Sequence, residues 1–161
     1  MTEITVDKDF EALTMTFVAE FDAPVERVWQ VWEDPRQLER WWGPPGWPAT
    51  FTRHDFTVGG QSRYYMTGPD GEKAPGWWEI TAIEAPHRLV FDDGFADDDG
   101  EPRREDMVTT MTVTLEDIDG RTRMTNTGQF SDPAEFEKML AMGMEDGMRQ
   151  AVGQIDAILA G

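Results

Sequence analysis

The chain has no cysteine, only two histidines, and 14 lysine and arginine residues against 32 aspartates and glutamates. Without cysteine there can be no disulfides, thiolate catalysis or Cys-ligated metals. The formal net charge of −18 argues against a nucleic-acid surface, because phosphate binding needs clustered lysine and arginine. No apolar run approaches the ~20 residues of a membrane-spanning helix, and the N-terminal residues lack the form of a signal peptide. We therefore expect a cytoplasmic protein with no nucleic-acid partner and no membrane insertion.

Metal and catalytic signatures are also scarce. His54 and His87 lie in separate segments without metal-ligand spacing. The acidic run over 92–106 fails as a calcium loop, because aligning Gly100 with the obligatory glycine puts Phe95, which offers no oxygen, at the first ligand position. Nucleophilic catalysis has no elbow motif. We predict no metal site, no cofactor and no catalytic residue, although the sequence leaves open an enzyme acting on a hydrophobic substrate.

The elements that are present indicate an α+β domain. Residues 12–21 alternate apolar and polar side chains, as in a half-buried strand. A helix from Pro24 and a second one capped by Asp34 follow. Alternation then predicts six more strands, over 50–58, 61–67, 77–83, 88–91, 108–116 and 121–130. Residues 132–160 predict one long helix of about 40 Å, capped by Asp132.

Connection lengths favour one end of this sheet as a binding rim. In an antiparallel meander of the six later strands, alternate connections lie at opposite ends. The connections at 58–60, 85–87 and 117–120 are tight and share one end. The Trp- and Pro-rich stretch "RWWGPPGWP" at 40–48 and the long loops at 68–76 and 93–104 share the other. Long loops gathered at one end of a scaffold are typical of a binding rim.

Four segments carry a resemblance to a known family. They are "FDAPVERVWQVWEDPRQLERWWGPPGW", "VGGQSRYYMTGPDG", "HRLVF" and "MEDGMRQAVGQIDAIL", in this order along the chain. They resemble the SRPBCC/START-like (Bet v-like) superfamily and, within it, the family of the activator of the heat-shock-protein-90 ATPase. The resemblance implies a helix-grip fold: a curved antiparallel sheet of about seven strands wrapped around a long C-terminal helix, with two short helices after the first strand. It implies a single domain over 1–161, structured over about 10–160.

The same resemblance implies an apolar cavity between the sheet and the C-terminal helix. This chain departs from the family pattern at Ser62, Asn126 and Met148, each of which trims or polarises the inferred cavity. Gly143 and Gly147 lie on the predicted sheet-facing stripe of the helix, where missing side chains leave room. The methionine-rich stripe suits a surface that repacks around varied guests. It also suits an ordinary core, and this alternative stays open for every residue of the stripe.

We predict that the cavity holds a small apolar or amphipathic molecule. Its predicted lining is Trp42, Trp47, Tyr64, Met66, Trp78, Phe91, Met111, Leu140, Met144 and Met148. Trp41 is expected to cap the core, and the loop around it to form a semi-rigid wall of the cavity mouth. Two alternatives remain: a co-chaperone-like module that binds a chaperone ATPase, implied by the family alone, and a cyclase or hydrolase acting in the same cavity. Homodimerisation is left open.

Overall fold

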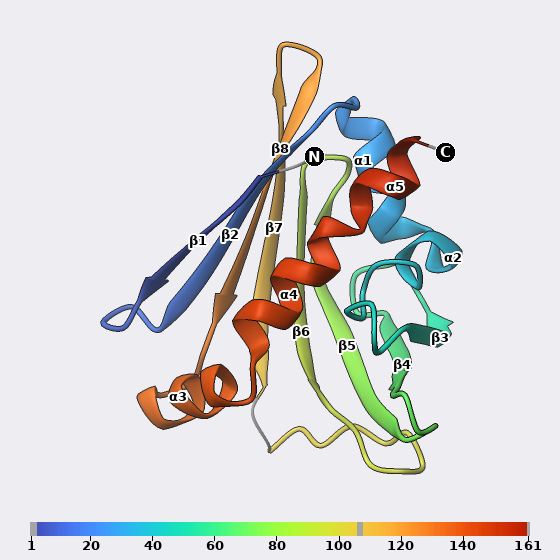
Figure 1. Ribbon diagram of the computed structural model, residues 1–161, viewed down its shortest axis with the longest axis vertical. Helices are drawn as coiled ribbons and strands as arrows, with labels where there is room; N and C mark the ends of the chain where they lie inside the picture. The colour runs from blue at the N-terminus through green and yellow to red at the C-terminus, as the bar shows by residue number, and fades with distance from the viewer. Residues whose placement is uncertain (1–2, 106–107, 161) are drawn as a thin grey trace.

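The computed structural model describes residues 3–105 and 108–160. One curved eight-stranded sheet is covered on one face by helices (Figure 1). The strands are β1 (Ile4–Asp9), β2 (Thr14–Phe21), β3 (Ala49–His54), β4 (Gln61–Thr67), β5 (Lys73–Glu84), β6 (Arg88–Phe95), β7 (Thr109–Ile118) and β8 (Arg121–Gln129). The helices are α1 (Val25–Glu33), α2 (Pro35–Leu38), α3 (Pro133–Ala141), α4 (Met144–Gly153) and α5 (Ile155–Ala160). The α+β helix-grip prediction is confirmed.

The sheet is antiparallel throughout, with strand order β1-β2-β8-β7-β6-β5-β4-β3. The six later strands therefore form the expected meander, and β2 joins it by pairing with β8. The short β5–β6 and β7–β8 turns lie at one end of the sheet, while the β4–β5 and β6–β7 loops lie at the other (Figure 1). The sequence did not predict β1, which lies before residue 10 and forms a sheet edge beside β2. The strand count is therefore eight rather than about seven.

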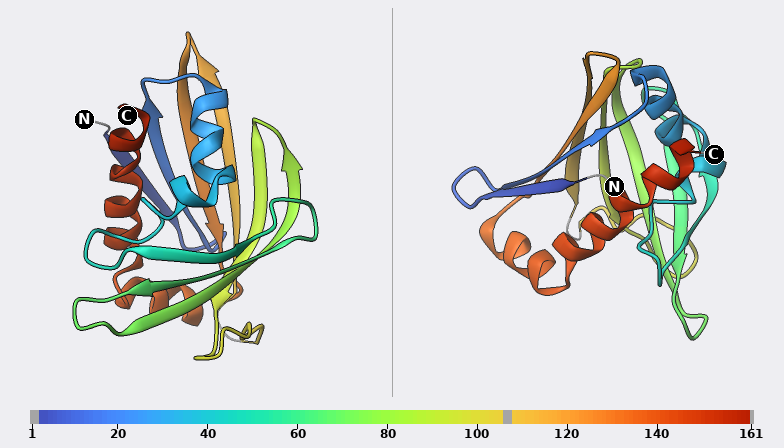
Figure 2. Two further views of the ribbon diagram at one scale, coloured as in Figure 1. Left: turned by 90° about the vertical axis from the view of Figure 1, so that its right-hand side faces the viewer. Right: turned by 45° about the horizontal axis from the view of Figure 1, so that its top comes forward.

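Inner-face residues of the strands form the core with α1, α2, α4 and α5. Along β2 buried and half-buried residues alternate, as a strand with one covered face requires. α1 buries Val25, Val28, Trp29 and Trp32 at helical spacing against the same face. Asp34 caps α2 by accepting a hydrogen bond from the Arg36 backbone N–H at 2.9 Å. Figure 2 shows the helices gathered on one side of the sheet.

The C-terminal segment is three helices rather than the single long helix that the sequence predicts. Asp132 caps α3 as expected, accepting from the Glu135 backbone N–H at 2.8 Å. The helix stops at Met142, because Gly143 takes a left-handed conformation with φ of 85°. α3 packs on a separate apolar cluster in which the rings of Phe130 and Phe136 stack at 4.6 Å. α4 and α5 cross the sheet (Figure 1).

The Trp- and Pro-rich loop buries two of its three tryptophans. Trp41 is fully buried, as expected: its ring packs edge-on to Trp32 at 4.6 Å, and its indole N–H donates to the Val31 carbonyl at 2.9 Å. Trp42 packs edge-on to Trp78 at 4.8 Å. The Gln154 side chain donates to the Gly43 carbonyl at 2.7 Å. The loop is thereby attached both to the aromatic core and to the end of α4.

Candidate functional site

An apolar pocket of about 220 Å³ lies between α4 and the sheet. Its walls come from the C-terminal half of β4, the end of β6, the start of β7, the residues Trp42 and Pro44 of the Trp- and Pro-rich loop, and the methionines of α3 and α4. It therefore opens at the end of the sheet that carries the long connections. Five methionines line it: Met66, Met111, Met139, Met144 and Met148. A smaller hollow of about 20 Å³ adjoins it and shares Met111, Met144 and Met148.

Strand register brings the polar pair of this pocket together. Asp93 on β6 pairs with Trp78 on β5, and Gly76 on β5 pairs with Tyr64 on β4, so Tyr64 and Asp93 share the inner face. A Cβ atom at Gly76 would lie 2.4 Å from the Tyr64 ring. The glycine therefore leaves the space that the tyrosine ring fills, and the Tyr64 hydroxyl donates to Asp93 Oδ1 at 2.9 Å.

Asp93 is an acid in an apolar wall. Burial raises the pKa of its carboxyl from 3.8 to about 7, because the charged form loses water. The hydrogen bonds from Tyr64 and from the Gly94 backbone oppose the rise, but are weaker than the effect of burial. Burial, and then the Asp93 charge, raise the pKa of Tyr64 well above 10. Asp93 therefore changes charge near neutral pH, whereas Tyr64 stays a neutral donor.

The structure brings six of the ten predicted lining residues to this pocket: Trp42, Tyr64, Met66, Met111, Met144 and Met148. Trp78 and Phe91 are fully buried behind the lining, with their rings stacked at 4.0 Å. Leu140 packs instead on the α3 cluster, and Trp47 lies against the β4–β5 turn at Gly68. A role in ligand binding stays a prediction for all ten.

Sequence reasoning missed the pocket residues Asp93, Phe95 and Met139. The signal for Asp93 was available, because continuing the alternation of β6 from Leu89 and Phe91 places it on the inner face. The expected strand ended at Phe91, so the acid was assigned to the loop. The carboxylates of Glu79 on β5 and Glu145 on α4 do not line the pocket and pair with Arg104 and Lys8.

A serine and a histidine also meet, but outside the pocket. His54 Nε2 lies 3.0 Å from the Trp32 carbonyl, which can only accept, so Nε2 carries the proton. Burial lowers the pKa of His54 below 6.5, so the ring is neutral at pH 7 and its Nδ1 accepts from the Ser62 hydroxyl, 2.7 Å away. Ser62 is fully buried and does not line the pocket. The pair therefore satisfies polar groups inside the core and offers no nucleophile to a substrate.

Asn126 is a buried amide without a hydrogen-bonding partner among the described residues. It is fully buried on β8, between Phe17 and Val113, and neither amide atom is hydrogen-bonded to a described residue. Leaving such a group unpaired costs about 1–3 kcal/mol. We expect Asn126→Leu to raise the free energy of unfolding by about 1–2 kcal/mol in urea denaturation.

The control for this prediction is Thr122→Val on the same strand. The Thr122 hydroxyl is buried and donates to the Ala23 carbonyl at 2.7 Å, so its loss is expected to lower stability by about 1 kcal/mol. If Asn126→Leu instead destabilised the protein as much as the control does, the amide would have a hydrogen-bonding partner in solution.

Other sites receive less support from the described part of the chain. Larger depressions of about 710 and 650 Å³ lie on the exterior and are lined mostly by charged side chains. Among the residues with assigned positions, no group of three or more His, Cys, Asp or Glu could hold a metal ion. None of the described helices is both long and apolar enough to cross a bilayer.

Solved structures resemble this fold closely. A protein of Arthrobacter aurescens is 63% identical, with 97% of this chain and 91% of that one covered and a TM-score of 0.93. A protein of Mycobacterium smegmatis is 48% identical, with 98% and 97% covered and a TM-score of 0.89. A protein of Rhodobacter sphaeroides is 25% identical, with 98% and 99% covered and a TM-score of 0.84.

The family assignment rests on a match over most of the chain. No functionally curated protein matches this chain. The family model described as "Activator of Hsp90 ATPase homolog 1-like protein" matches residues 22–160, from the end of β2 through α5. The chain therefore belongs to the family of Activator of Hsp90 ATPase homolog 1-like proteins.

Proposed function

We propose that this protein binds a small apolar or amphipathic molecule in the pocket between α4 and the sheet. The observation that supports it is a hollow of about 220 Å³ whose lining is mainly methionine and aromatic, with one hydrogen-bonded acid. Binding sites generally combine such an apolar lining with a few placed polar groups.

The volume limits the size of the ligand. Pockets for drug-sized ligands measure roughly 300–1,000 Å³, whereas a dry cavity of roughly 150 Å³ holds benzene. A pocket of about 220 Å³ thus fits one ring with a short substituent, or an aliphatic chain of similar size. Methionine side chains are flexible, so the five in the lining can adjust to related shapes. The chaperone alternative rests on the family description alone and does not enter this proposal.

Filling the pocket from α4 provides the test. Gly147 lines the pocket, and a Cβ added there meets nothing within 4 Å, so Gly147→Leu places a side chain in the hollow. The matched control is Gly153→Leu, since Gly153 is exposed, lies on the same helix and also has open space at Cβ. We expect Gly147→Leu to weaken binding of 2-phenylethanol at least about tenfold, and Gly153→Leu to leave it unchanged.

Methionine methyl NMR is the measurement. In the titration, signals of Met66, Met111, Met144 and Met148 are expected to shift and saturate together. Met142 is 58% exposed outside the lining and serves as the internal reference. The proposal fails if a panel of one-ring compounds, neutral and charged, shifts none of the lining methyls in the folded protein.

A further inference from the structure

Among its described lining residues the pocket contains one carboxyl group, that of Asp93. Of the described lining residues, only Tyr64 and Asp93 are titratable, and none is lysine, arginine or histidine. We propose that the ligand of this pocket is an organic cation, an apolar molecule with an ammonium group that pairs with the Asp93 carboxylate. This inference rests on the proposed function and specifies its ligand class.

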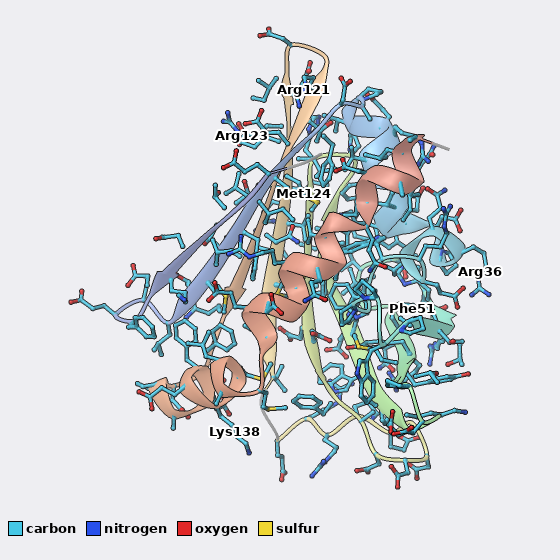
Figure 3. The ribbon with its side chains drawn as sticks, in the orientation of Figure 1. Arg36, Phe51, Arg121, Arg123, Met124 and Lys138 are labelled. Carbon is cyan, nitrogen blue, oxygen red and sulfur yellow. The ribbon has the colours of Figure 1, made fainter. Side chains whose placement is uncertain are left out.

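None of the described lysine and arginine residues lines this pocket. Arg121 and Arg123 pair with Glu20 near the β7–β8 turn, and Arg36 on α2 donates to the Phe51 carbonyl at 3.0 Å (Figure 3). Lys138 is exposed on α3 and extends away from the sheet (Figure 3). An ionised Asp93 therefore receives no charge compensation from the described lining residues. A ligand cation would provide it.

Within the described part of the chain, the elements around Asp93 present it with one titratable group. From β4 that group is Tyr64, a donor at 2.9 Å. From β5 and β7 its register partners are Trp78 and Thr109. From α3 and α4 the pocket receives methionines and Gly147. The charged residues of α4 do not line it: Glu145 pairs with Lys8 and Arg149, and Asp146 accepts from Gln150.

The rest of the lining also suits an ammonium group on an apolar body. Trp42, Tyr64 and Phe95 border the pocket, and aromatic faces attract cations within ~6 Å of the ring centroid. Methionine sulfur is polarizable and packs well on apolar groups. The net charge of −18 favours the approach of cations over anions. Asp93, however, would attract the cation only when it is ionised.

This requirement fixes how affinity depends on pH. Because burial raises the Asp93 pKa to about 7, its ionised fraction in the free protein rises from about one-tenth at pH 6 to about nine-tenths at pH 8. An alkylammonium group, with a pKa near ~10, stays charged at both values. Affinity for a cation should therefore be about tenfold higher at pH 8. A neutral ligand that accepts a hydrogen bond from the protonated Asp93 carboxyl would show the opposite trend.

The test compares two probes of the same skeleton, 2-phenylethylamine and 2-phenylethanol, by calorimetric titration at pH 6 and pH 8. We expect the amine to bind more tightly than the alcohol at pH 8, and to gain about tenfold between the two pH values. Asp93→Asn should abolish that gain while alcohol binding remains. Tyr64→Phe removes the donor to Oδ1, so it should move the midpoint of the amine's pH profile upward.

The outcomes separate this inference from the proposed function. If the alcohol binds but the amine binds no better at pH 8, the cation proposal is wrong and pocket binding stands. If the alcohol at pH 6 binds more tightly than the amine at pH 8, a neutral acceptor is the preferred class and the cation proposal is again wrong. If neither these two probes nor the panel of one-ring compounds shifts the lining methionine methyls, both proposals fail. An unchanged pH profile in Tyr64→Phe would exclude Asp93 as the titrating group.

Discussion

Gly43→Ala is expected to lower the free energy of unfolding by about 3 kcal/mol, through overpacking in a loop that cannot yield. A Cβ atom at Gly43 would lie 1.9 Å from the backbone oxygen of Trp47 and 3.1 Å from the backbone nitrogen of Ala49. Both are main-chain atoms, so no side-chain rotation relieves the clash. The loop itself is tied down, because Gln154 bonds the Gly43 carbonyl and the Trp47 backbone N–H donates to Pro44 at 2.8 Å.

The second glycine of the same loop is the control. A Cβ at Gly46 meets nothing within 4 Å, and the residue is exposed. Gly46→Ala is expected to change stability by less than ~0.5 kcal/mol. Urea denaturation of both variants measures the difference. Equal stability of the two variants would contradict this prediction. It would mean that the loop moves freely despite its hydrogen bonds from Gln154 to Gly43 and from Trp47 to Pro44.

Asp93→Asn is expected to change how stability depends on pH, by about 4 kcal/mol in total. The Asp93 pKa rises from 3.8 to about 7 on folding, so the folded state favours the protonated acid. The resulting stabilisation is full below about pH 4 and is lost as pH rises through about 7. Relative to the variant, the natural protein should lose ~1.4 kcal/mol per pH unit across this interval.

The measurement must separate Asp93 from His54, which acts in the opposite direction. Burial lowers the pKa of His54 below 6.5, so its stabilising contribution is present above that pH and is lost on acidification. Both proteins carry His54, so its effect cancels when urea stability of Asp93→Asn and of the natural protein is compared at each pH. Parallel curves between pH 4 and pH 8 would show that Asp93 has an ordinary pKa.

The pocket wall combines tight packing of neutral groups with one buried ionisable group. The Trp- and Pro-rich loop, which contains Gly43, holds Trp42 in this wall by tight packing. Asp93 places in the same wall a group whose charge is unfavourable at neutral pH in the empty pocket. A bound cation would remove that cost, so ligand binding and pH stability should change together at one residue.

Much of the fold could be predicted because its signals are local. The bounds of β4 agree residue for residue with the predicted strand 61–67, since alternation there ends in turns at both sides. The caps at Asp34 and Asp132 were also predicted, because a cap needs only residues close in sequence. β1 was missed: it is an edge strand with mostly exposed residues, so the alternation carries little information.

The break in the C-terminal helix could not be predicted from the helix itself. Glycine occupies right-handed and left-handed conformations about equally, so Gly143 is compatible with a continuous helix or with a turn. The stack of Phe136 on Phe130 and Phe10 selects the turn, through contacts made across the chain. Leu140 packs on that cluster and does not line the pocket.

The amino-acid sequence alone determined the antiparallel meander, the starts of α1, α2 and α3, and the end of the sheet at which a pocket forms. These features follow from apolar residues that recur every two or every 3.6 residues and from the lengths of the loops, all of which can be counted in the sequence. Only the tertiary structure decided that Tyr64 and Asp93 form a hydrogen bond and that Trp47 packs against Gly68 instead of lining the pocket. It also decided that burial desolvates the Asp93 carboxyl. Desolvation and contact between distant strands are properties of the packed molecule, because each depends on neighbours that no local pattern specifies.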